Sequence, residues 1–253
     1  MAENKPGGVQ SVTRALDILE AIDGAGGELA LIDIAAASGL PTPTIHRLVR
    51  TLVDRGYLRQ LPDRRYALGS RLIPLGSTAL TAFGSRSTPE LRRLVSELGE
   101  TANLATLDGD QVVYVGQVPS PHAMRMFTDL GRHVPAHCRA TGKALLSQLP
   151  DEQIRTILRR TGMPAFTPRT ITSPDELLTQ LATVRERGWA VDEGELEEGV
   201  VCLAVPVPSS IASLAVSISG PAVRVDERVR ARAVPLLTKV AADLAAQLDV
   251  ASA

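Results

Sequence analysis

The chain has 253 residues, of which 44% are hydrophobic and 22% charged, and its formal net charge is −1. A chain of this length forms one large domain or two modest ones, and its apolar content excludes a mainly disordered protein. No apolar run reaches the roughly 18 residues of a membrane-spanning helix, and the first ten residues lack the pattern of a signal peptide. Two cysteines are too few for a disulfide framework or a four-thiolate zinc site. We therefore expect a cytoplasmic protein with reduced thiols and no membrane partner.

Positive charge is concentrated in one part of the chain. Residues 41–71 carry seven arginines against two aspartates, a local net charge of +5. Such a segment is typical of a nucleic-acid-binding module joined to another domain, although charge alone fits a solvated arginine face equally well. Residues 192–198 show the opposite bias, with five carboxylates. We interpret this acidic stretch as a solvated loop.

The basic segment lies within a recognisable series of short elements. Apolar spacing predicts helices at residues 10–22, 31–38 and 43–55. Gly39 lies in the turn between the last two, with Thr42 as the predicted N-cap and Pro43 at the first helical position. Residues 57–59 and 65–68 form a predicted β-hairpin. This order predicts a winged helix-turn-helix in which the third helix contacts DNA; a purely structural three-helix module is the alternative.

The rest of the chain predicts an α+β domain. Residues 68–83 form a predicted linker helix, the domain boundary is expected near Ser85, and a new helix begins at Thr88. A capping box at Ser173 is expected to open a helix that ends near Gly188. The other predicted elements are strands at 103–107, 111–118, 123–127, 189–192, 200–207 and 213–219, and helices at 141–149, 151–160 and 226–248. Their order favours a mostly antiparallel sheet.

Enzyme chemistry finds little support in this second domain. The sequence from Ala140 to Ala144 lacks the glycine and the Ser or Thr of a phosphate-binding loop. The histidines and Cys138 lack metal-ligand spacing. Cys202 lies in an apolar strand, where a buried and inert thiol is the usual outcome. We expect no enzyme activity, no cofactor and no metal.

A small ligand pocket is the remaining interpretation. Ser217 and Ser219 are two residues apart on one strand and so share a face, as do Val200 and Cys202 on the neighbouring strand. Hydroxyl groups beside apolar side chains are typical of ligand sites. Ala140 and Thr141 open a predicted helix, whose free N–H groups favour an anion. Met124 or Met126 is expected to supply an apolar wall.

Taken together, these motifs resemble the IclR family of bacterial transcriptional regulators over nearly the whole chain. No single motif carries the resemblance, but their order does. In chain order they are Arg14-Ala15-Leu16-Asp17-Ile18-Leu19, Leu40-Pro41-x-x-Thr44-x-His46-Arg47-Leu48, Gly56-Tyr57, Tyr66-x-Leu68-Gly69, Gly131-x-x-x-Pro135-x-His137, Thr141-Gly142-Lys143-Ala144, Gly188-Trp189-Ala190-Val191-Asp192, Glu195-x-x-x-Gly199-Val200-x-Cys202-x-Ala204-x-Pro206 and Ser217-x-Ser219-Gly220-Pro221.

The resemblance implies a ligand-responsive repressor or activator of a small-molecule catabolic operon. Its implied domains are a winged helix-turn-helix at 1–68, a linker helix at 69–87 and a GAF-like effector-binding domain at 88–253. It further implies dimers or dimers of dimers on palindromic or pseudo-palindromic operator DNA, and a small organic or aromatic acid as effector. Ligand positions of family members that bind small keto acids fall here on Ala140, Thr141, Val200, Cys202, Ser217 and Ser219.

DNA contacts are expected from the third helix and the hairpin. Near the start of that helix, Thr42 and Pro43 differ from the residues common in the family, so the resemblance predicts no base preference. The residues expected at the DNA are Arg14, Thr42, Thr44, His46, Arg47, Arg50, Arg59, Arg64 and Arg65. Two alternatives remain open at this stage: a second domain that only oligomerises, and an enzyme that acts on the bound small molecule.

Overall fold

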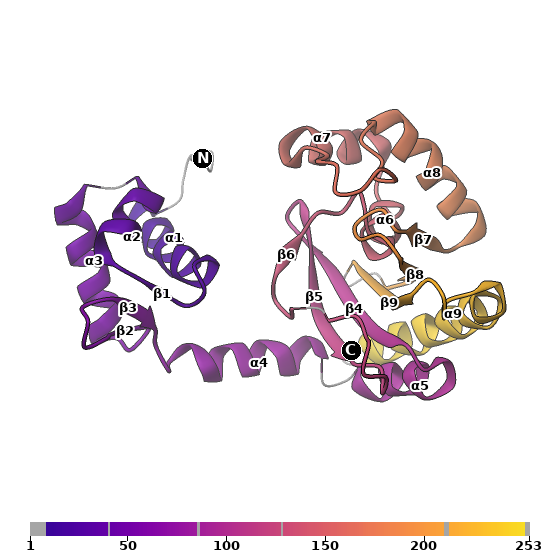
Figure 1. Ribbon diagram of the computed structural model, residues 1–253, viewed down its shortest axis with the longest axis horizontal. Helices are drawn as coiled ribbons and strands as arrows, with labels where there is room; N and C mark the ends of the chain where they lie inside the picture. Colours follow the sequence, from indigo (N-terminus) through magenta and orange to yellow (C-terminus); the bar gives the residue numbers. More distant parts are fainter. Residues whose placement is uncertain (1–8, 40, 85–86, 128, 210–212, 251–253) are drawn as a thin grey trace. The chain divides into compact units, whose positions relative to one another are not determined.

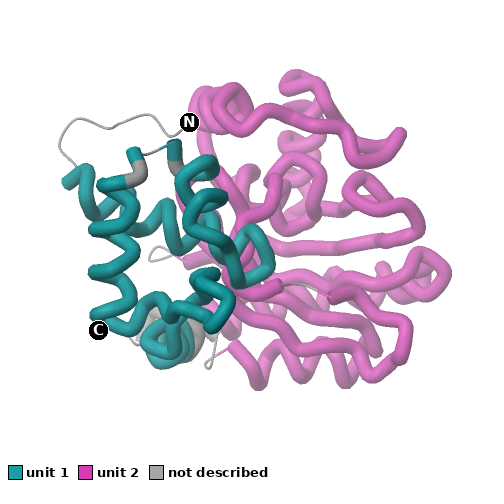
Figure 2. Tube along the Cα trace, turned by 60° about the vertical axis from the view of Figure 1, so that its left-hand side comes forward, with its two compact units in different colours: residues 1–79 teal, residues 80–253 magenta. Residues whose placement is uncertain are grey.

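The structure is a computed structural model that describes residues 9–39, 41–84, 87–127, 129–209 and 213–250. Internal contacts divide the chain into two units, residues 1–79 and 80–253 (Figure 2). No helix within the described ranges is both long enough and apolar enough to cross a membrane. The expected boundary near Ser85 lies outside the described residues. The division into domains at 1–68, 69–87 and 88–253 stays a prediction.

Unit 1 combines helices with a small antiparallel sheet in the order β1-β3-β2 (Figure 1). A helix, α4, starts in this unit and crosses the division between the two. The elements are α1 (Gln10–Gly24), β1 (Glu28–Leu29), α2 (Leu31–Ser38), α3 (Thr42–Asp54), β2 (Leu58–Gln60), β3 (Tyr66–Leu68) and α4 (Leu72–Gly84).

The helices of unit 1 pack around one apolar core. Ile18 and Ile22 of α1 meet Ile45 and Val49 of α3, and all four are buried. The apolar residues of α3 recur at helical spacing, so burying them turns the other face of this helix to solvent. The core thus fixes which side of α3 is free to meet a partner.

The predicted elements of unit 1 are confirmed, with boundaries that shift by a few residues, as is usual for helix ends. The main shift is at α3, where Thr42 is the first helical residue and Pro41 precedes the helix, so the predicted N-cap is one residue off. The side chain of Thr42 and all of Leu40 lie outside what the structure describes. Strand β1, which pairs with β3, was not predicted because two residues carry no periodicity.

Unit 2 is a mixed α+β fold built on a six-stranded antiparallel sheet in the order β6-β5-β4-β9-β8-β7. The predicted antiparallel architecture is confirmed. Its elements are α5 (Thr88–Leu98), β4 (Thr101–Asp108), β5 (Gln111–Val118), β6 (His133–Val134), α6 (Ala140–Leu146), α7 (Asp151–Thr161), α8 (Pro174–Arg187), β7 (Ala190–Glu193), β8 (Val200–Val207), β9 (Leu214–Pro221) and α9 (Glu227–Val250).

Helices cover both faces of this sheet. Helices α5 and α9 lie on one face, while α6, α7 and α8 lie on the other (Figure 1). Successive side chains of a strand point to opposite faces of the sheet, so each strand contributes residues alternately to the two cores. In β9, Val216 and Ile218 join the α5/α9 core, whereas Ala215 joins the α6–α8 core. By the same alternation Ser217 and Ser219 face the α6 side.

Two local predictions for unit 2 are wrong. Residues 123–127 form no strand; instead β6 pairs with β5. The 123–127 segment has no strand partner, and the carbonyl of Met126 accepts a bond from the Thr101 hydroxyl at 3.2 Å. Ser173 occupies the N-cap position of α8 but makes no side-chain capping bond, so the predicted capping box does not form.

Candidate nucleic-acid interface and ligand pocket

The solvent face of α3 carries cations beside a groove. His46, Arg47 and Arg50 are exposed on successive turns and, together with Gln60 of β2 and Tyr66 of β3, line a cavity of about 390 Å³. Arg50 lies 4.0 Å from Asp54, and both side chains are largely exposed. Such an exposed pair is weak, so Arg50 can exchange its partner for a phosphate.

The other residues expected at the DNA differ in their exposure to solvent. Arg59 and Arg64 are exposed, and Thr44 and Arg14 are half-buried. Arg64 has a φ of 68°, the left-handed conformation of a tight turn. Because β2 and β3 pair directly, this turn projects Arg64 at the tip of the hairpin.

Arg65 stands apart because two carboxylates already neutralise it. Its guanidinium lies 3.0 Å from Glu28 of β1 and 2.6 Å from Asp63 in the turn. The hydrogen bond from Arg65 lowers the pKa of Asp63, which keeps that carboxylate charged. The structure therefore gives Arg65 a role in holding the hairpin to β1.

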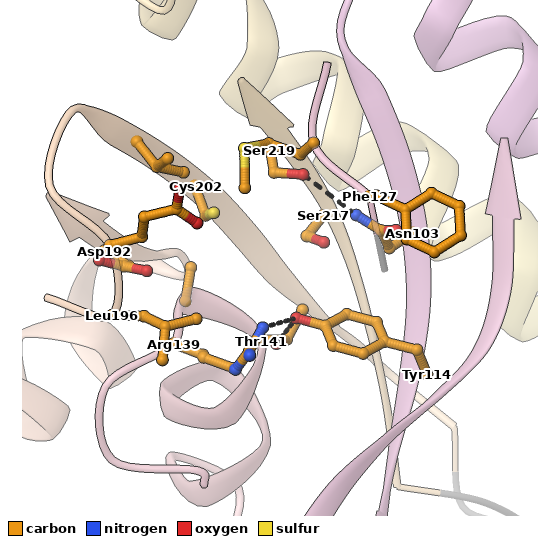
Figure 3. Close-up of a pocket in the computed structure, with 14 residues that line it drawn as sticks. Asn103, Tyr114, Phe127, Arg139, Thr141, Asp192, Leu196, Cys202, Ser217 and Ser219 are labelled. Atoms are coloured by element: carbon orange, nitrogen blue, oxygen red, sulfur yellow. Dashed lines mark hydrogen bonds between the residues drawn. The ribbon is translucent and has the colours of Figure 1, made fainter. Parts of the chain in front are cut away.

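In unit 2, a cavity of about 110 Å³ opens between the sheet and the start of α6 (Figure 3). The structure brings all six predicted ligand residues to it. On the same measure a single water needs roughly 10–15 Å³, so the cavity has room for a small organic molecule. The lining residues are Asn103, Tyr114, Met126, Phe127, Arg139, Ala140, Thr141, Asp192, Leu196, Glu197, Val200, Cys202, Ser217 and Ser219.

Strand pairing places the polar groups on the sheet side of the pocket. Asn103 is paired with Ser217, and Cys202 with Ser219, in the registers of β4, β9 and β8. The Asn103 amide donates to the Ser219 hydroxyl at 3.3 Å and accepts from Gln117 at 3.1 Å. Because Ser219 is the acceptor in the first of these bonds, its own O–H hydrogen remains available to donate to another group. Of the two methionines considered for the apolar wall, Met126 lines the cavity and Met124 does not; Met124 is 72% exposed.

The other side of the pocket is formed by α6 and the residue before it. The hydroxyls of Tyr114 and Thr141 lie 3.2 Å apart, and Arg139 donates to the Tyr114 hydroxyl at 3.3 Å. The Arg139 guanidinium also lies 5.7 Å from the centre of the Tyr114 ring. Its Nε is buried without a hydrogen-bond partner, and no described carboxylate lies within ion-pair distance of it. Arg139 is thus a half-buried pocket cation whose Nε–H lacks an acceptor.

Close backbone contact brings α6 to this position. A Cβ atom on Gly142 would lie 2.1 Å from the carbonyl oxygen of Ala136, well inside contact distance. Only glycine fits there, and its absence of a side chain lets α6 sit against the chain that precedes it. The neighbouring His137 is buried and bonds the Pro164 carbonyl at 3.1 Å, which is a structural role.

The acidic stretch is not the solvated loop that was predicted. Asp192 and Glu195 are buried, and only its other three carboxylates are exposed. Asp192 lines the pocket and accepts the Glu195 N–H at 2.7 Å. Burial raises the pKa of Asp192, while the nearby Lys143 and Arg139 oppose that rise. The stretch is buried because a lysine some fifty residues earlier in the chain pairs with Glu195.

Burial also decides the state of the pocket thiol. Burial raises the pKa of Cys202 far above neutral pH, so the side chain is a protonated thiol. Cys138 is fully buried and its pKa is raised to about 12. Neither cysteine has the lowered pKa of a nucleophilic thiolate.

Known proteins resemble the chain across both units. Residues 11–62 match the model of the "IclR helix-turn-helix domain" and residues 81–246 match that of the "Bacterial transcriptional regulator IclR C-terminal". The chain belongs to the IclR family. The predicted family and its function are therefore confirmed: this is a ligand-responsive, DNA-binding transcriptional regulator.

Three relatives illustrate the breadth of the IclR-family match. The chain is 38% identical over 231 residues to the "Transcriptional repressor IclR" of Escherichia coli, covering 88% of this chain and 84% of that one. Identity and coverage are the same for the "Acetate operon repressor" of Salmonella typhimurium. An IclR homolog from Microbacterium hydrocarbonoxydans, solved in complex with 4-hydroxybenzoate, is 25% identical with a TM-score of 0.79, covering 95% of this chain and all of the other.

Proposed function

We propose that this regulator controls a catabolic operon in response to a small organic or aromatic acid that binds at Arg139, Thr141, Ser217 and Ser219. The observation that carries the proposal is the guanidinium of Arg139, which lines the cavity and has a buried N–H group without an acceptor. A carboxylate supplies the missing acceptor and a compensating charge, and arginine binds carboxylates in a fixed geometry. The relatives that act on an acetate operon and bind 4-hydroxybenzoate support the same class of ligand.

The polar groups of the pocket assign an orientation to the acid. Asp192 and Leu196 lie on one side of the cavity, with Asn103 and Tyr114 on the opposite side (Figure 3). The ligand carboxylate belongs beside Arg139 and the serine hydroxyls, away from the carboxylates of Asp192 and Glu197. Apolar contact then comes from Val200 and Met126, which line the same cavity.

The unit that holds this pocket acts as a sensor and not as an enzyme. Both thiols are protonated because burial raises their pKa, and Lys143, a further candidate nucleophile, is paired with Glu195. A domain that only oligomerises would have no need of a cation beside a cavity with a buried N–H group left without an acceptor. Thermal stabilisation by small acids, with the acid recovered unchanged, separates the sensor from both alternatives.

We assign DNA binding to α3 and to the hairpin of unit 1. The regulator is proposed to act as a homodimer or a dimer of dimers. Its place of action is the cytoplasm, where the chromosome lies. The apolar side chains that α1 and α4 leave exposed support a protomer contact: Val12 and Leu16 of α1 and Ile73 and Leu75 of α4 are each more than half exposed. Exposed apolar side chains that gather on a surface are typical of protein–protein contacts.

We expect selection from random duplexes with the full chain to yield a palindromic or pseudo-palindromic operator. A two-fold dimer presents two copies of α3, and their half-sites lie about one helical turn of DNA apart or a multiple of it. Sedimentation of the complex should then show at least two protomers on each site. An asymmetric site occupied by one protomer would contradict the dimer.

We expect Arg59→Gln to lower the slope of log affinity against log salt concentration by about one. Its exposed guanidinium is free to contact a phosphate, and each phosphate contact releases counterions. Arg65→Gln is the matched control on the same hairpin, with a smaller change expected because Glu28 and Asp63 already neutralise this arginine. Binding titrations across a salt series measure both slopes, and equal changes would refute the distinction.

A further inference from the structure

The segment 194–199, here called the strap, joins β7 to β8 and forms a thin wall of the pocket. Leu196 and Glu197 of the strap line the cavity. Gly194 and Gly199, at its two ends, have φ values of 82° and 79°, which only glycine adopts at little cost. Gly194, Glu198 and Gly199 also line a second, more open groove of about 450 Å³. The strap therefore borders two cavities.

The side chain of Glu195, the second residue of the strap, does not line the pocket and instead meets Lys143 of α6. Glu195 and Lys143 form a buried ion pair, and Lys143 is fully buried. The Lys143 ammonium also donates to the carbonyl of Val191 at 3.0 Å. One lysine on α6 is thus bound to β7 and to the strap that follows it.

The backbone on both sides of Glu195 is held as well. Its N–H donates to Asp192 at 2.7 Å, and its carbonyl accepts from the Thr170 hydroxyl. The Thr167 hydroxyl donates to the carbonyl of Gly194 at 2.7 Å. Further along the strap, the Leu196 N–H also bonds Asp192, the Glu197 carbonyl accepts from the Val200 N–H at 3.2 Å, and the Gly199 carbonyl accepts from the Ala222 N–H at 2.7 Å. The first half of the strap, up to Leu196, is thus held at Glu195 and Asp192, while Glu197 is also held from the start of β8.

The ion pair also joins two walls of the same pocket. Ala140 and Thr141, in the first turn of α6, line the cavity, and Lys143 follows on that helix. A buried ion pair stabilises a fold little more than apolar side chains of similar volume do, but it demands one geometry. Here the ion pair fixes the distance between α6 and the strap.

We propose that Lys143 and Glu195 are positioning residues, a clasp that holds the strap against α6 and so sets the width and accessibility of the pocket. The clasp touches no ligand. A role of the clasp in regulation rests on the proposed effector site, because a strap that moves away from α6 would open that pocket.

Cys202 gives a direct readout of the clasp, since its thiol lines the pocket while Cys138 is buried elsewhere in the same unit. In the full chain, the double variant Lys143→Met/Glu195→Met replaces the ion pair by apolar side chains of similar volume. Methyl methanethiosulfonate is the probe, and peptide mass spectrometry reads each cysteine separately. We expect Cys202 to react at least about tenfold faster than in the unmodified chain, because opening the pocket both admits the reagent and hydrates the thiol. The rate at Cys138 should not change.

Two further variants make the result decisive. Thr170→Val removes one hydrogen bond to the Glu195 carbonyl and leaves the ion pair intact. It should accelerate labelling of Cys202 by a smaller factor than the double variant does. This variant keeps the test available where the double variant fails to fold. Arg155→Gln breaks an exposed ion pair between α7 and α8 and should leave both rates unchanged. Unchanged reactivity of Cys202 in the folded variants, or an equal rise at both cysteines, would overturn the clasp.

The same assay separates the clasp from the proposed function. With 4-hydroxybenzoate and pyruvate as probe acids, the unmodified chain should show slower labelling of Cys202. If neither acid protects Cys202 while the double variant still reacts faster, the clasp stands and these acids are excluded as ligands. If the acids protect but the variants react at the parental rate, the effector site stands and the clasp fails.

Discussion

Replacing Arg47 by alanine is expected to weaken binding to the operator by about 1–3 kcal/mol and to relax base preference at one position, the effect of losing a guanine contact. The reason lies in the packing of α3. Ile45 and Val49 are buried, so the intervening His46 and Arg47 point to solvent. Among the described residues no carboxylate pairs with Arg47, and its guanidinium is free to reach a base edge.

Arg50→Ala is the matched control on the same face of α3. Arg50 lies about one turn further along the helix, and its loose contact with Asp54 is easily exchanged for a phosphate. Its loss should weaken binding to all sequences alike, because phosphate contacts position a protein without reading the bases. Titrations of the selected operator and of single-base variants measure both effects. An Arg47→Ala protein with unaltered affinity and base preference would show that another residue reads the DNA.

The sequence predicted the parts of the pocket that depend on local periodicity. Ser217, Ser219, Val200 and Cys202 could be assigned to common faces because strand side chains alternate. The start of α6 followed from its helical pattern. In both cases the required signal lies within a few residues of the chain.

The parts that were missed depend on strand order and long-range pairing. Asn103 joins the pocket because β4 lies beside β9 in the sheet, although over a hundred residues separate Asn103 from its partner Ser217. Arg139 was not predicted as a ligand residue. Its significance comes from a buried Nε–H group without an acceptor, and no sequence pattern records that. Glu195 looked solvated because its partner Lys143 lies on another element. Alternation in residues 123–127 suggested a strand, but no neighbouring strand was available to pair with it.

The largest effect on ligand binding is expected from Arg139→Met, which should cost an acid effector about 2–5 kcal/mol, the usual penalty for removing one partner of a buried, hydrogen-bonded charge pair. The double variant Ser217→Ala/Ser219→Ala should cost about 1–3 kcal/mol for each hydroxyl bond that the ligand loses. Calorimetry with an acid found by thermal stabilisation measures both.

The two methionines give a control, because Met126 lines the cavity and Met124 is exposed outside it. Met126→Ala should therefore weaken binding and Met124→Ala should not. Unchanged affinity in both the Arg139 and the double serine variants would place the effector site elsewhere in the molecule.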